Sequence, residues 1–280
     1  MKQRTEESIR LRCPCCGAAL SLEGHDSLTC SACSSIYPIV DGIPKIMAPL
    51  VAADVQSFFE RIATEHHEGN LSYVQFNSPQ LDYQLRILSQ AVIRVLRRRV
   101  QPGGQLLDVG CGHGALLEGL GPDYGRVGVD FVYEMLPFAK QRGYQAYQGD
   151  AMALPFESNQ FDAVICAELI QFFADPGALL GELARVCRPG GAVIVSTLFR
   201  WSILRALVRA FSPALRASAF PFPIIRRTPD ELVKLGERLS LRFLDVAWVY
   251  SPTGVINVDK KRSNIGAPFA TNFILSFEKI

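Results

Sequence analysis

A glycine-rich turn at the end of an apolar strand constrains the fold of this chain more than any other feature. Residues 105–110 are typical of a buried strand and lead into Gly110, Gly112 and Gly114, with a helix expected over 115–120. In open α/β sheets, ligands bind where strands end and helices begin, and glycines let the backbone approach them closely. The GxGxG spacing differs from the GxGxxG of dinucleotide-binding proteins, so the turn alone does not indicate a dinucleotide.

Strands and helices alternate through the chain from residue 101 onward. This order is typical of an α/β fold, a parallel sheet with helices on both faces. After about Thr228, the pattern predicts a helix and two final strands. The expected strands are residues 105–110, 124–130, 144–150, 161–167, 191–197, 240–250 and 270–280.

Acidic residues stand near the ends of the first three of these strands. Asp108 precedes the first glycine by two residues, Asp130 ends the second strand and Asp150 ends the third. A carboxylate at Asp130 can accept hydrogen bonds from ribose hydroxyls, and one at Asp150 can accept from an adenine amino group. Structural roles remain open: Asp108 as a cap of the turn, Gly114 for close packing and Asp150 as a helix N-cap.

Five segments together resemble the class I S-adenosylmethionine-dependent methyltransferases, in particular those with small-molecule substrates. The segments are LLDVGCGHG, VGVD, GDAMALPF, FDAVICAELIQFFADP and ELARVCRPGGAVIVS, in this order. The resemblance covers about residues 100–280 and implies a Rossmann-like sheet of seven strands whose last strand is antiparallel. It also implies S-adenosyl-L-methionine as cofactor and a small, apolar or aromatic molecule as the methyl acceptor.

The resemblance also assigns cofactor contacts, but it assigns no catalytic base. Many family members have a histidine after the fourth strand, where this chain has Gln171, and glutamine cannot serve as a general base near neutral pH. The expected contacts are Asp108, Gly110 and Gly112 near the methionine portion, Gly114 in the same turn, Asp130 at the ribose, Asp150 and Ala151 at the adenine edge, and Glu168 facing the cofactor or substrate.

Five of the eight cysteines lie within the first 33 residues. Two CxxC pairs, Cys13 with Cys16 and Cys30 with Cys33, have the spacing with which four thiolates surround zinc at about 2.3 Å each. So short a module buries too little apolar surface to fold alone, so the zinc is expected to be structural. Cys15 is interpreted as a surplus thiol, and unliganded core cysteines are the alternative to a metal site.

This N-terminal segment resembles the zinc-ribbon module of the Trm112-like family, which occurs alone or fused ahead of methyltransferase domains. The chain is therefore expected to comprise a small β zinc ribbon over 9–48, a helical cap or linker over 49–100 and a methyltransferase domain over 101–280. The linker contains the sequence His66, His67, Glu68, in which adjacent residues point apart, so a loop or a partly exposed helix is a better interpretation than a base or a metal site.

Two further segments leave several interpretations open. A helix is predicted to begin at Pro79, and Arg94, Arg97, Arg98 and Arg99 at its end are either solvated cations near a helix C-terminus or a phosphate-binding patch for RNA. The insertion over 201–227 is a lid packed on the core, an apolar mouth for the acceptor, or a peripheral membrane contact.

Composition excludes several other classes of protein. Hydrophobic residues make up 49% and charged residues 20%, which is typical of a folded chain. The net charge of +2 is too small to indicate nucleic-acid binding by itself, and the charged start is not a signal peptide. No uncharged stretch reaches the roughly 18 residues of a membrane helix, so a cytoplasmic protein is expected. The competing functions are an rRNA or tRNA base methyltransferase and a non-methylating scaffold of the same fold.

Overall fold

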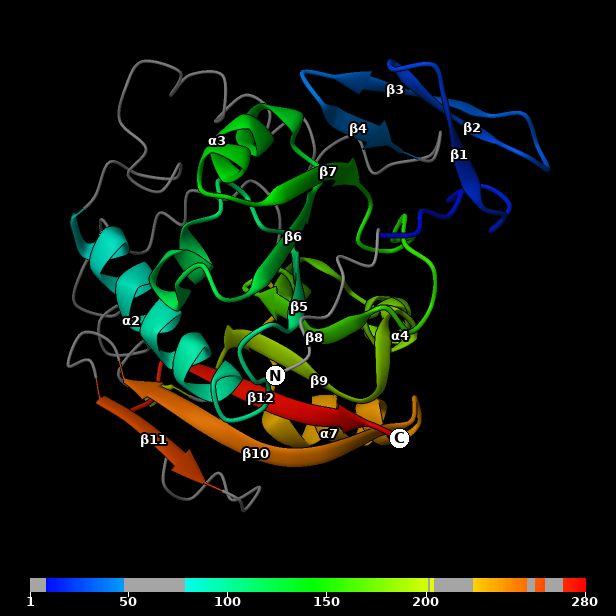
Figure 1. Ribbon diagram of the computed structural model, residues 1–280. Helices are drawn as coiled ribbons and strands as arrows, with labels where there is room; N and C mark the ends of the chain where they lie inside the picture. The colour runs from blue at the N-terminus through cyan, green and yellow to red at the C-terminus, as the bar shows by residue number, and fades with distance from the viewer. Residues whose placement is uncertain (1–8, 48–78, 201, 204–223, 251–254, 260–268) are drawn as a thin grey trace.

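One continuous sheet organises the protein (Figure 1). The computed structural model describes residues 9–47, 79–200, 202–203, 224–250, 255–259 and 269–280. The strands of these ranges, in spatial order, are β1 (Leu20–Glu23), β2 (Ser27–Cys30), β3 (Ile36–Val40), β4 (Ile43–Ile46), β7 (Gln145–Gly149), β6 (Gly125–Asp130), β5 (Gln105–Val109), β8 (Phe161–Ala167), β9 (Cys187–Leu198), β12 (Asn272–Lys279), β10 (Leu241–Tyr250) and β11 (Val255–Asp259). The helices are α2 (Pro79–Leu96), η1 (Ala115–Leu120), η2 (Tyr133–Met135), α3 (Leu136–Gln141), η3 (Ile170–Phe172), α4 (Gly177–Val186) and α7 (Pro229–Glu237).

The centre of the sheet confirms the predicted α/β topology. Strands β7, β6, β5, β8 and β9 are parallel neighbours, whereas β12 pairs antiparallel with both β9 and β10. The last strand is therefore antiparallel, as predicted. The expected number of seven strands is exceeded, because β11 extends the sheet beyond β10 and β4 extends it beyond β7.

Two apolar layers cover the two faces of the sheet. Helices α2, η1 and α3 pack on one face, where Leu96 and Leu117 are fully buried. Helices α4 and α7 cover the other face, where Leu183 is fully buried. Within β5, Leu106 belongs to the first layer and Leu107 to the second, which explains why such strands are continuously apolar.

The N-terminal hairpins continue the sheet beyond β7, as the blue strands of Figure 1 show. Asp41 and Gly42 join β3 to β4 with φ angles of 52° and 71°, the positive values that a two-residue hairpin turn favours. Strand β4 then pairs in parallel with β7, and its last residue, Ile46, is fully buried in the second apolar layer. The ribbon and the sheet therefore share one core, which the sequence did not predict.

Local sequence signals predicted the positions of two helices well and the type of a third poorly. α2 begins at Pro79, and α7 begins after Thr228, whose hydroxyl accepts the N–H of Glu231. The helix expected over 115–120 is instead the 3-10 helix η1, because only six residues separate Gly114 and Gly121, whose φ angles are both positive. The part of the predicted helical cap or linker that precedes Pro79 lies outside the described residues.

The strand predicted to begin at residue 191 begins earlier in the structure. β9 begins at Cys187, and its pairing with β8 jumps from Phe161–Cys187 to Ala163–Ala192. The four residues before the predicted start are thus an irregular beginning of the strand itself. None of the helices within the described ranges combines the length and apolar character needed to cross a membrane.

Replacing Ile46 by alanine tests whether the ribbon shares the core of the sheet. Ile46→Ala is expected to lower the free energy of unfolding by about 2–5 kcal/mol, because the side chain is fully buried. Ile36→Ala is the matched control, since Ile36 lies on the same ribbon but is 65% exposed, and its change should stay within about 0.5 kcal/mol. Urea unfolding followed by tryptophan fluorescence measures both, and equal losses would contradict the shared core.

Candidate functional site

The predicted site residues meet at one edge of the sheet. Because β7, β6, β5 and β8 are parallel neighbours, their carboxyl ends lie side by side. Asp150, Asp130, the glycine turn over 110–114 and Glu168 follow or end these four strands in that order. The fold therefore brings together residues that are distant in the sequence.

Two glycines of the turn have different surroundings. Gly112 has a φ of 51°, and no atom lies within 4 Å of the position that a Cβ would occupy there. A Cβ on Gly114 would instead lie 3.0 Å from the Tyr144 ring and 3.1 Å from the Ala139 Cα. Gly112 thus leaves the backbone accessible to a ligand, whereas Gly114 allows close packing, which was one of its two interpretations.

Asp130 at the end of β6 is bonded to this turn. Its Oδ2 accepts the Gly112 N–H at 2.7 Å, and its Oδ1 accepts the Val132 N–H at 2.9 Å. The side chain is half-buried, and a carboxylate retains lone pairs beyond these two bonds. Burial raises the pKa of Asp130, although these backbone N–H groups lower it. The carboxylate is therefore positioned to accept further hydrogen bonds from a ligand.

Asp108 lies behind the turn rather than at the open edge. It is 1% exposed, and its Oδ2 accepts the Tyr144 hydroxyl at 3.0 Å. Burial raises the pKa of Asp108 to about 7, while the bond from Tyr144 lowers it and the nearby Asp130 adds to the increase. Asp108 supports the turn from within the sheet, and its contact with the cofactor stays a prediction.

Asp150 caps the turn that follows β7. Its Oδ1 accepts the Met152 N–H at 2.8 Å, and its carbonyl accepts the Ala153 N–H at 3.1 Å. It therefore caps a turn and not a helix. Asp150 and Ala151 are both half-buried at the same edge as Asp130.

Glu168 holds an unusual backbone conformation directly after β8. Its φ is 56°, a region that residues with side chains rarely adopt. Its N–H donates to the Ser196 carbonyl, and its Oε1 accepts the Ser196 hydroxyl, both at 3.1 Å. Such strain concentrates at ligand-binding positions, and here the neighbouring strand β9 holds it in place.

Gln171 stands where members of the resembled family often have a histidine. It forms hydrogen bonds within the fold. It is buried, its Oε1 accepts the Thr197 hydroxyl at 3.4 Å, and its carbonyl accepts the Ile225 N–H at 2.9 Å. The sequence did not indicate its partner Thr197, nor the partners Tyr144 and Ser196 described above. These residues come from other strands or loops, so no local pattern marks them.

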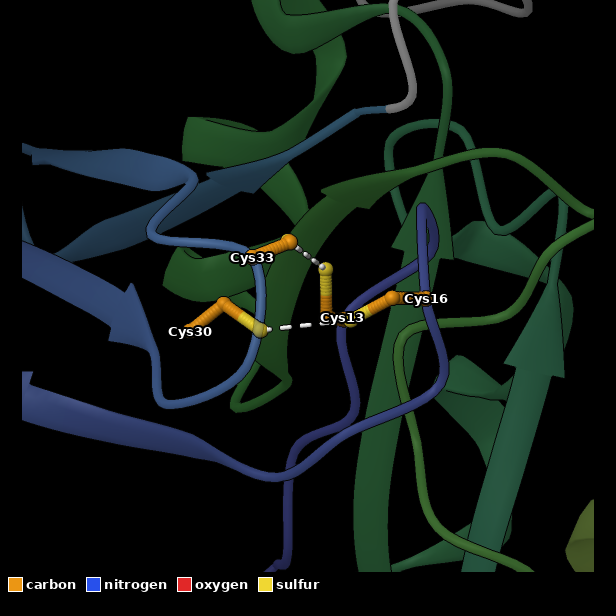
Figure 2. A group of neighbouring side chains, drawn as sticks. All are labelled: Cys13, Cys16, Cys30 and Cys33. Carbon is orange, nitrogen blue, oxygen red and sulfur yellow. Dashed lines mark hydrogen bonds between the residues drawn. The ribbon is translucent and has the colours of Figure 1, made fainter.

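The four predicted cysteines form a cluster between the segment before β1 and the turn that joins β2 to β3 (Figure 2). All four Sγ atoms of Cys13, Cys16, Cys30 and Cys33 lie within 4.8 Å of one another. Cys13 and Cys33 are 3.7 Å apart, and Cys16 and Cys30 are 3.4 Å apart. Zinc–sulfur bonds of about 2.3 Å in a tetrahedron put sulfur atoms about 3.8 Å apart. The cluster therefore has the size of a four-thiolate zinc site.

The pKa values of two cysteines in the cluster bear on metal binding. The Ser35 hydroxyl and backbone lower the pKa of Cys33 to about 6, which favours the thiolate. The backbone of Ala18 lowers the pKa of Cys16, but contacts with Cys30, Cys33 and Cys13, together with burial, raise it to about 12. Binding of a dication would displace that proton, so metal affinity should increase with pH.

Cys15 and Tyr37 lie beside the cluster. The buried Tyr37 hydroxyl is 3.0 Å from the Cys13 Sγ and 3.4 Å from the Cys15 Sγ. Cys15 is exposed and is not part of the four-cysteine group, consistent with its interpretation as a surplus thiol. Tyr37 was not predicted, because its role depends on a contact with a residue 24 positions earlier.

The arginines at the end of α2 separate into two environments. Arg99 forms an ion pair with Asp245 of β10 and belongs to the folded structure. Arg94, Arg97 and Arg98 are exposed and line a groove of about 710 Å³ between α2 and η1. The Arg97 guanidinium donates to the Gly119 carbonyl at 3.2 Å. The groove is a feature separate from the edge that holds Asp130 and Glu168.

Two predicted features lie outside the described residues. They are the His66, His67 and Glu68 segment, and most of the insertion over 201–227.

Sequence comparisons identify related proteins. A family described as a methyltransferase domain matches residues 107–195. A demethylmenaquinone methyltransferase of Renibacterium salmoninarum is 33% identical over 197 residues, which are 61% of this chain and 80% of that protein. A ubiquinone biosynthesis O-methyltransferase of Xylella fastidiosa is 29% identical, over 51% of this chain and 65% of that protein. The alignment thus spans slightly less than two thirds of the second relative.

Comparison of folds agrees with the sequence. A SAM-dependent methyltransferase of Thermotoga maritima matches with a TM-score of 0.58 and 20% identity. The match covers 80% of this chain and 99% of that structure. The fold predicted from the five segments is therefore confirmed.

Cys30→Ser tests whether the four-cysteine cluster binds zinc. A serine hydroxyl does not replace a zinc thiolate, so the variant is expected to lose the bound zinc, about one ion per chain in the unaltered protein. Cys15→Ser is the matched control and should retain it. Metal content after dialysis, measured by mass spectrometry, checks both, and zinc loss from the Cys15 variant alone would show that the ligands are misassigned.

Asp108→Asn tests the buried carboxyl group by its effect on pH-dependent stability. Because the pKa of Asp108 is raised to about 7 in the folded protein, the fold retains a proton that the unfolded chain releases from about pH 4 upward. The stability of the unaltered protein should therefore fall, relative to the asparagine variant, by about 2–4 kcal/mol as pH rises from 4 through 7.

Unfolding by urea at several pH values measures this difference. The matched control is Asp123→Asn, because Asp123 is exposed and should show no such trend. A constant difference between the Asp108 variant and the unaltered protein across this pH range would contradict the raised pKa.

Proposed function

The chain belongs to the family of S-adenosylmethionine-dependent methyltransferases, and we propose that it transfers a methyl group from this cofactor to a small apolar or aromatic acceptor. The observation that carries the proposal is the contact between Asp130 and Gly112. The half-buried carboxylate retains lone pairs, and the space beside Gly112 is open. A ribose that donates its hydroxyls to Asp130 fits this combination.

The remaining cofactor contacts follow from the same edge. We assign Asp150 and Ala151 to the adenine edge, because they directly follow β7, the strand next to that of Asp130. The backbone of Gly110 and Gly112 is assigned to the methionine portion, with Gly114 and Asp108 supporting the turn. Glu168 is assigned to the cofactor or substrate, because its strained backbone holds its carboxylate beside Ser196.

The protein's part in the reaction is mainly orientation. The cofactor supplies a methyl group on a positively charged sulfur, which is a good leaving group. Holding two reactants in line can lower a barrier by about 7–11 kcal/mol in favourable cases. Asp130, Asp150 and the glycine turn hold their positions through backbone hydrogen bonds, so their geometry is set before any ligand binds.

An aromatic acceptor depends less on a catalytic base, and no residue of this chain is assigned as one. The names of the two relatives refer to ubiquinone and demethylmenaquinone, both quinones, which supports a ring compound as the acceptor. A hydroxyl on an aromatic ring loses its proton near pH 10, far more readily than an aliphatic hydroxyl. Such an acceptor requires less help from a side chain such as Gln171, which cannot act as a base.

We further propose a structural zinc ion held by Cys13, Cys16, Cys30 and Cys33. The size of the cluster supports this assignment, as does the lowered pKa of Cys33. None of the eight cysteines, which all lie in the described part of the chain, forms a disulfide, and this favours a reducing compartment and hence the cytoplasm.

An RNA methyltransferase is the second candidate, and the arginine groove favours it. Guanidinium groups of Arg94, Arg97 and Arg98 line one groove, and arginines bind phosphates well. Binding of RNA that weakens steeply with added salt would support this candidate. The small net charge of +2 and the quinone-related names favour the small-molecule acceptor instead.

Binding of S-adenosylhomocysteine tests the cofactor site. Calorimetry should detect micromolar affinity in the purified protein, and Asp130→Ala should weaken it about 10- to 100-fold, through loss of charge-assisted hydrogen bonds. The matched control is Asp123→Ala, which removes an exposed aspartate that precedes the same strand. Unchanged affinity in the Asp130 variant would show that the ribose assignment is wrong.

Transfer of a labelled methyl group then distinguishes the acceptors. Incubation with methyl-labelled cofactor should place the label on small aromatic diols or quinols and leave added RNA unlabelled. Label on RNA alone would replace the small-molecule proposal by the second candidate. Cofactor binding with no transfer to either class would favour a non-methylating scaffold.

A further inference from the structure

We infer that the groove between α2 and η1 is a docking site for an acidic segment of a partner protein. The groove has a volume of about 710 Å³, and Arg86, Arg94, Arg97 and Arg98 line it. None of these arginines is assigned to the cofactor. The inference therefore adds a second surface to the protein and does not depend on which molecule accepts the methyl group.

Positive charge is concentrated in this groove. The charged residues that line it are the four arginines and one glutamate, Glu118, which gives a local net charge of +3, whereas the whole chain carries +2. Glu118 also lies close to Arg142, whose Nε is 3.8 Å from its Oε1. Complementary charge steers and selects partners, so the groove favours an anionic occupant.

The groove arginines repel one another in the free protein. Arg97 and Arg98 are three and four positions after Arg94, and the Arg97 N–H still bonds to the Ile93 carbonyl at 2.9 Å, as in a helix. Like charges at this spacing destabilise a helix. Among the described residues, no carboxylate forms an ion pair with Arg94 or Arg98. An anionic partner in the groove would relieve this repulsion.

The two sides of the groove are fixed to each other before a partner binds. The Ser89 hydroxyl of α2 donates to the Leu116 carbonyl at 2.6 Å, and the Arg97 guanidinium donates to the Gly119 carbonyl at 3.2 Å. Ala115 and Gly119 of η1 line the groove with little or no side chain, which leaves space between the helices. A site that is formed in advance loses less entropy when it binds.

The length and the apolar lining of the groove favour a peptide as the occupant. Leu85 and Arg98, the first and last residues of α2 and its end that line it, are 13 positions apart. That separation is about 20 Å along a helix, the length of about six residues of extended chain. Leu85 and Ile93 supply apolar surface among the arginines. A peptide in which acidic and apolar side chains alternate would match both kinds of lining.

RNA matches the surroundings of the groove less well. An RNA substrate has to bring a base to the cofactor edge, where the carboxylates of Asp130, Asp150 and Glu168 would repel its phosphates. Phosphate contacts also gain nothing from apolar side chains such as Leu85 and Ile93. Both observations favour an acidic protein segment over a nucleic acid.

Binding of a synthetic acidic peptide to the full chain tests the docking site. The probe is a fluorescein-labelled peptide of about eight residues, slightly longer than the groove, in which glutamate alternates with alanine or leucine. The control peptide has glutamine in place of every glutamate. Fluorescence anisotropy should show that the acidic peptide binds about 10-fold more tightly than the control peptide, and that added salt weakens this binding.

Substitutions in the groove identify the contact. Arg94→Gln and Arg98→Gln should each raise the dissociation constant of the acidic peptide about 2- to 5-fold, as expected for one exposed ion pair. Arg94→Lys and Arg98→Lys retain the charge and should change it less than about 2-fold. The matched control is Arg238→Gln, which removes an exposed arginine after α7 on the other face of the sheet and should leave peptide affinity unchanged.

Melting temperatures separate docking from a purely structural role of the arginines. Cations near the C-terminal end of a helix can stabilise it. If Arg94 and Arg98 served only that purpose, Arg98→Gln would lower the melting temperature and leave peptide affinity unchanged, and the inference would be wrong. If they form a docking site, Arg98→Gln should weaken peptide binding without lowering the melting temperature, because it removes one of several like charges.

Two further results would overturn the inference. The first is equal affinity of the protein for the acidic and the glutamine peptide. The second is much tighter binding of a single-stranded oligouridine of the same charge, lost in the Arg94→Gln and Arg98→Gln variants, which would assign the groove to RNA. Affinity for S-adenosylhomocysteine should be the same in all of these variants, so cofactor binding is tested separately from docking.

Discussion

Parallel pairing of β7, β6, β5 and β8 is the constraint on which the rest of the structure depends. Parallel neighbours end at the same edge of a sheet, so Asp150, Asp130, the glycine turn and Glu168 meet there although helices separate them in the sequence. Apolar layers bury both faces of these strands, which leaves the edge as the place where polar groups can face a ligand. Fold and site are thus two consequences of one pairing pattern.

The same pairing rule incorporates the ribbon into the fold. β4 adds to β7 as a further parallel strand, and its fully buried Ile46 joins the core of the sheet. This pairing also covers the edge of β7, which would otherwise present unpaired backbone groups. A small module that buries little surface of its own therefore gains stability from the larger domain.

Burial differs between Asp108 and Asp130, and so does the chemical environment of the two carboxyl groups. Asp108 is enclosed with Tyr144, and its pKa is raised to about 7 because water cannot solvate its charge. Asp130 has two backbone N–H donors and a partly exposed surface, which suits a hydrogen-bond acceptor. Asp108 and Asp130 thus have different environments, because only Asp130 reaches the open edge.

The sequence by itself determined the order of strands and helices, the glycine turn with its neighbouring acids, and the four cysteines, because short-range patterns encode these features. Only the tertiary structure decided that β4 pairs with β7, that Tyr144 faces Asp108, and that Ser196 holds Glu168. Each of these contacts joins residues far apart in the chain, and which strands become neighbours depends on the packing of the whole sheet. Local patterns therefore identify the parts of this site, and the long-range pairing of strands arranges them.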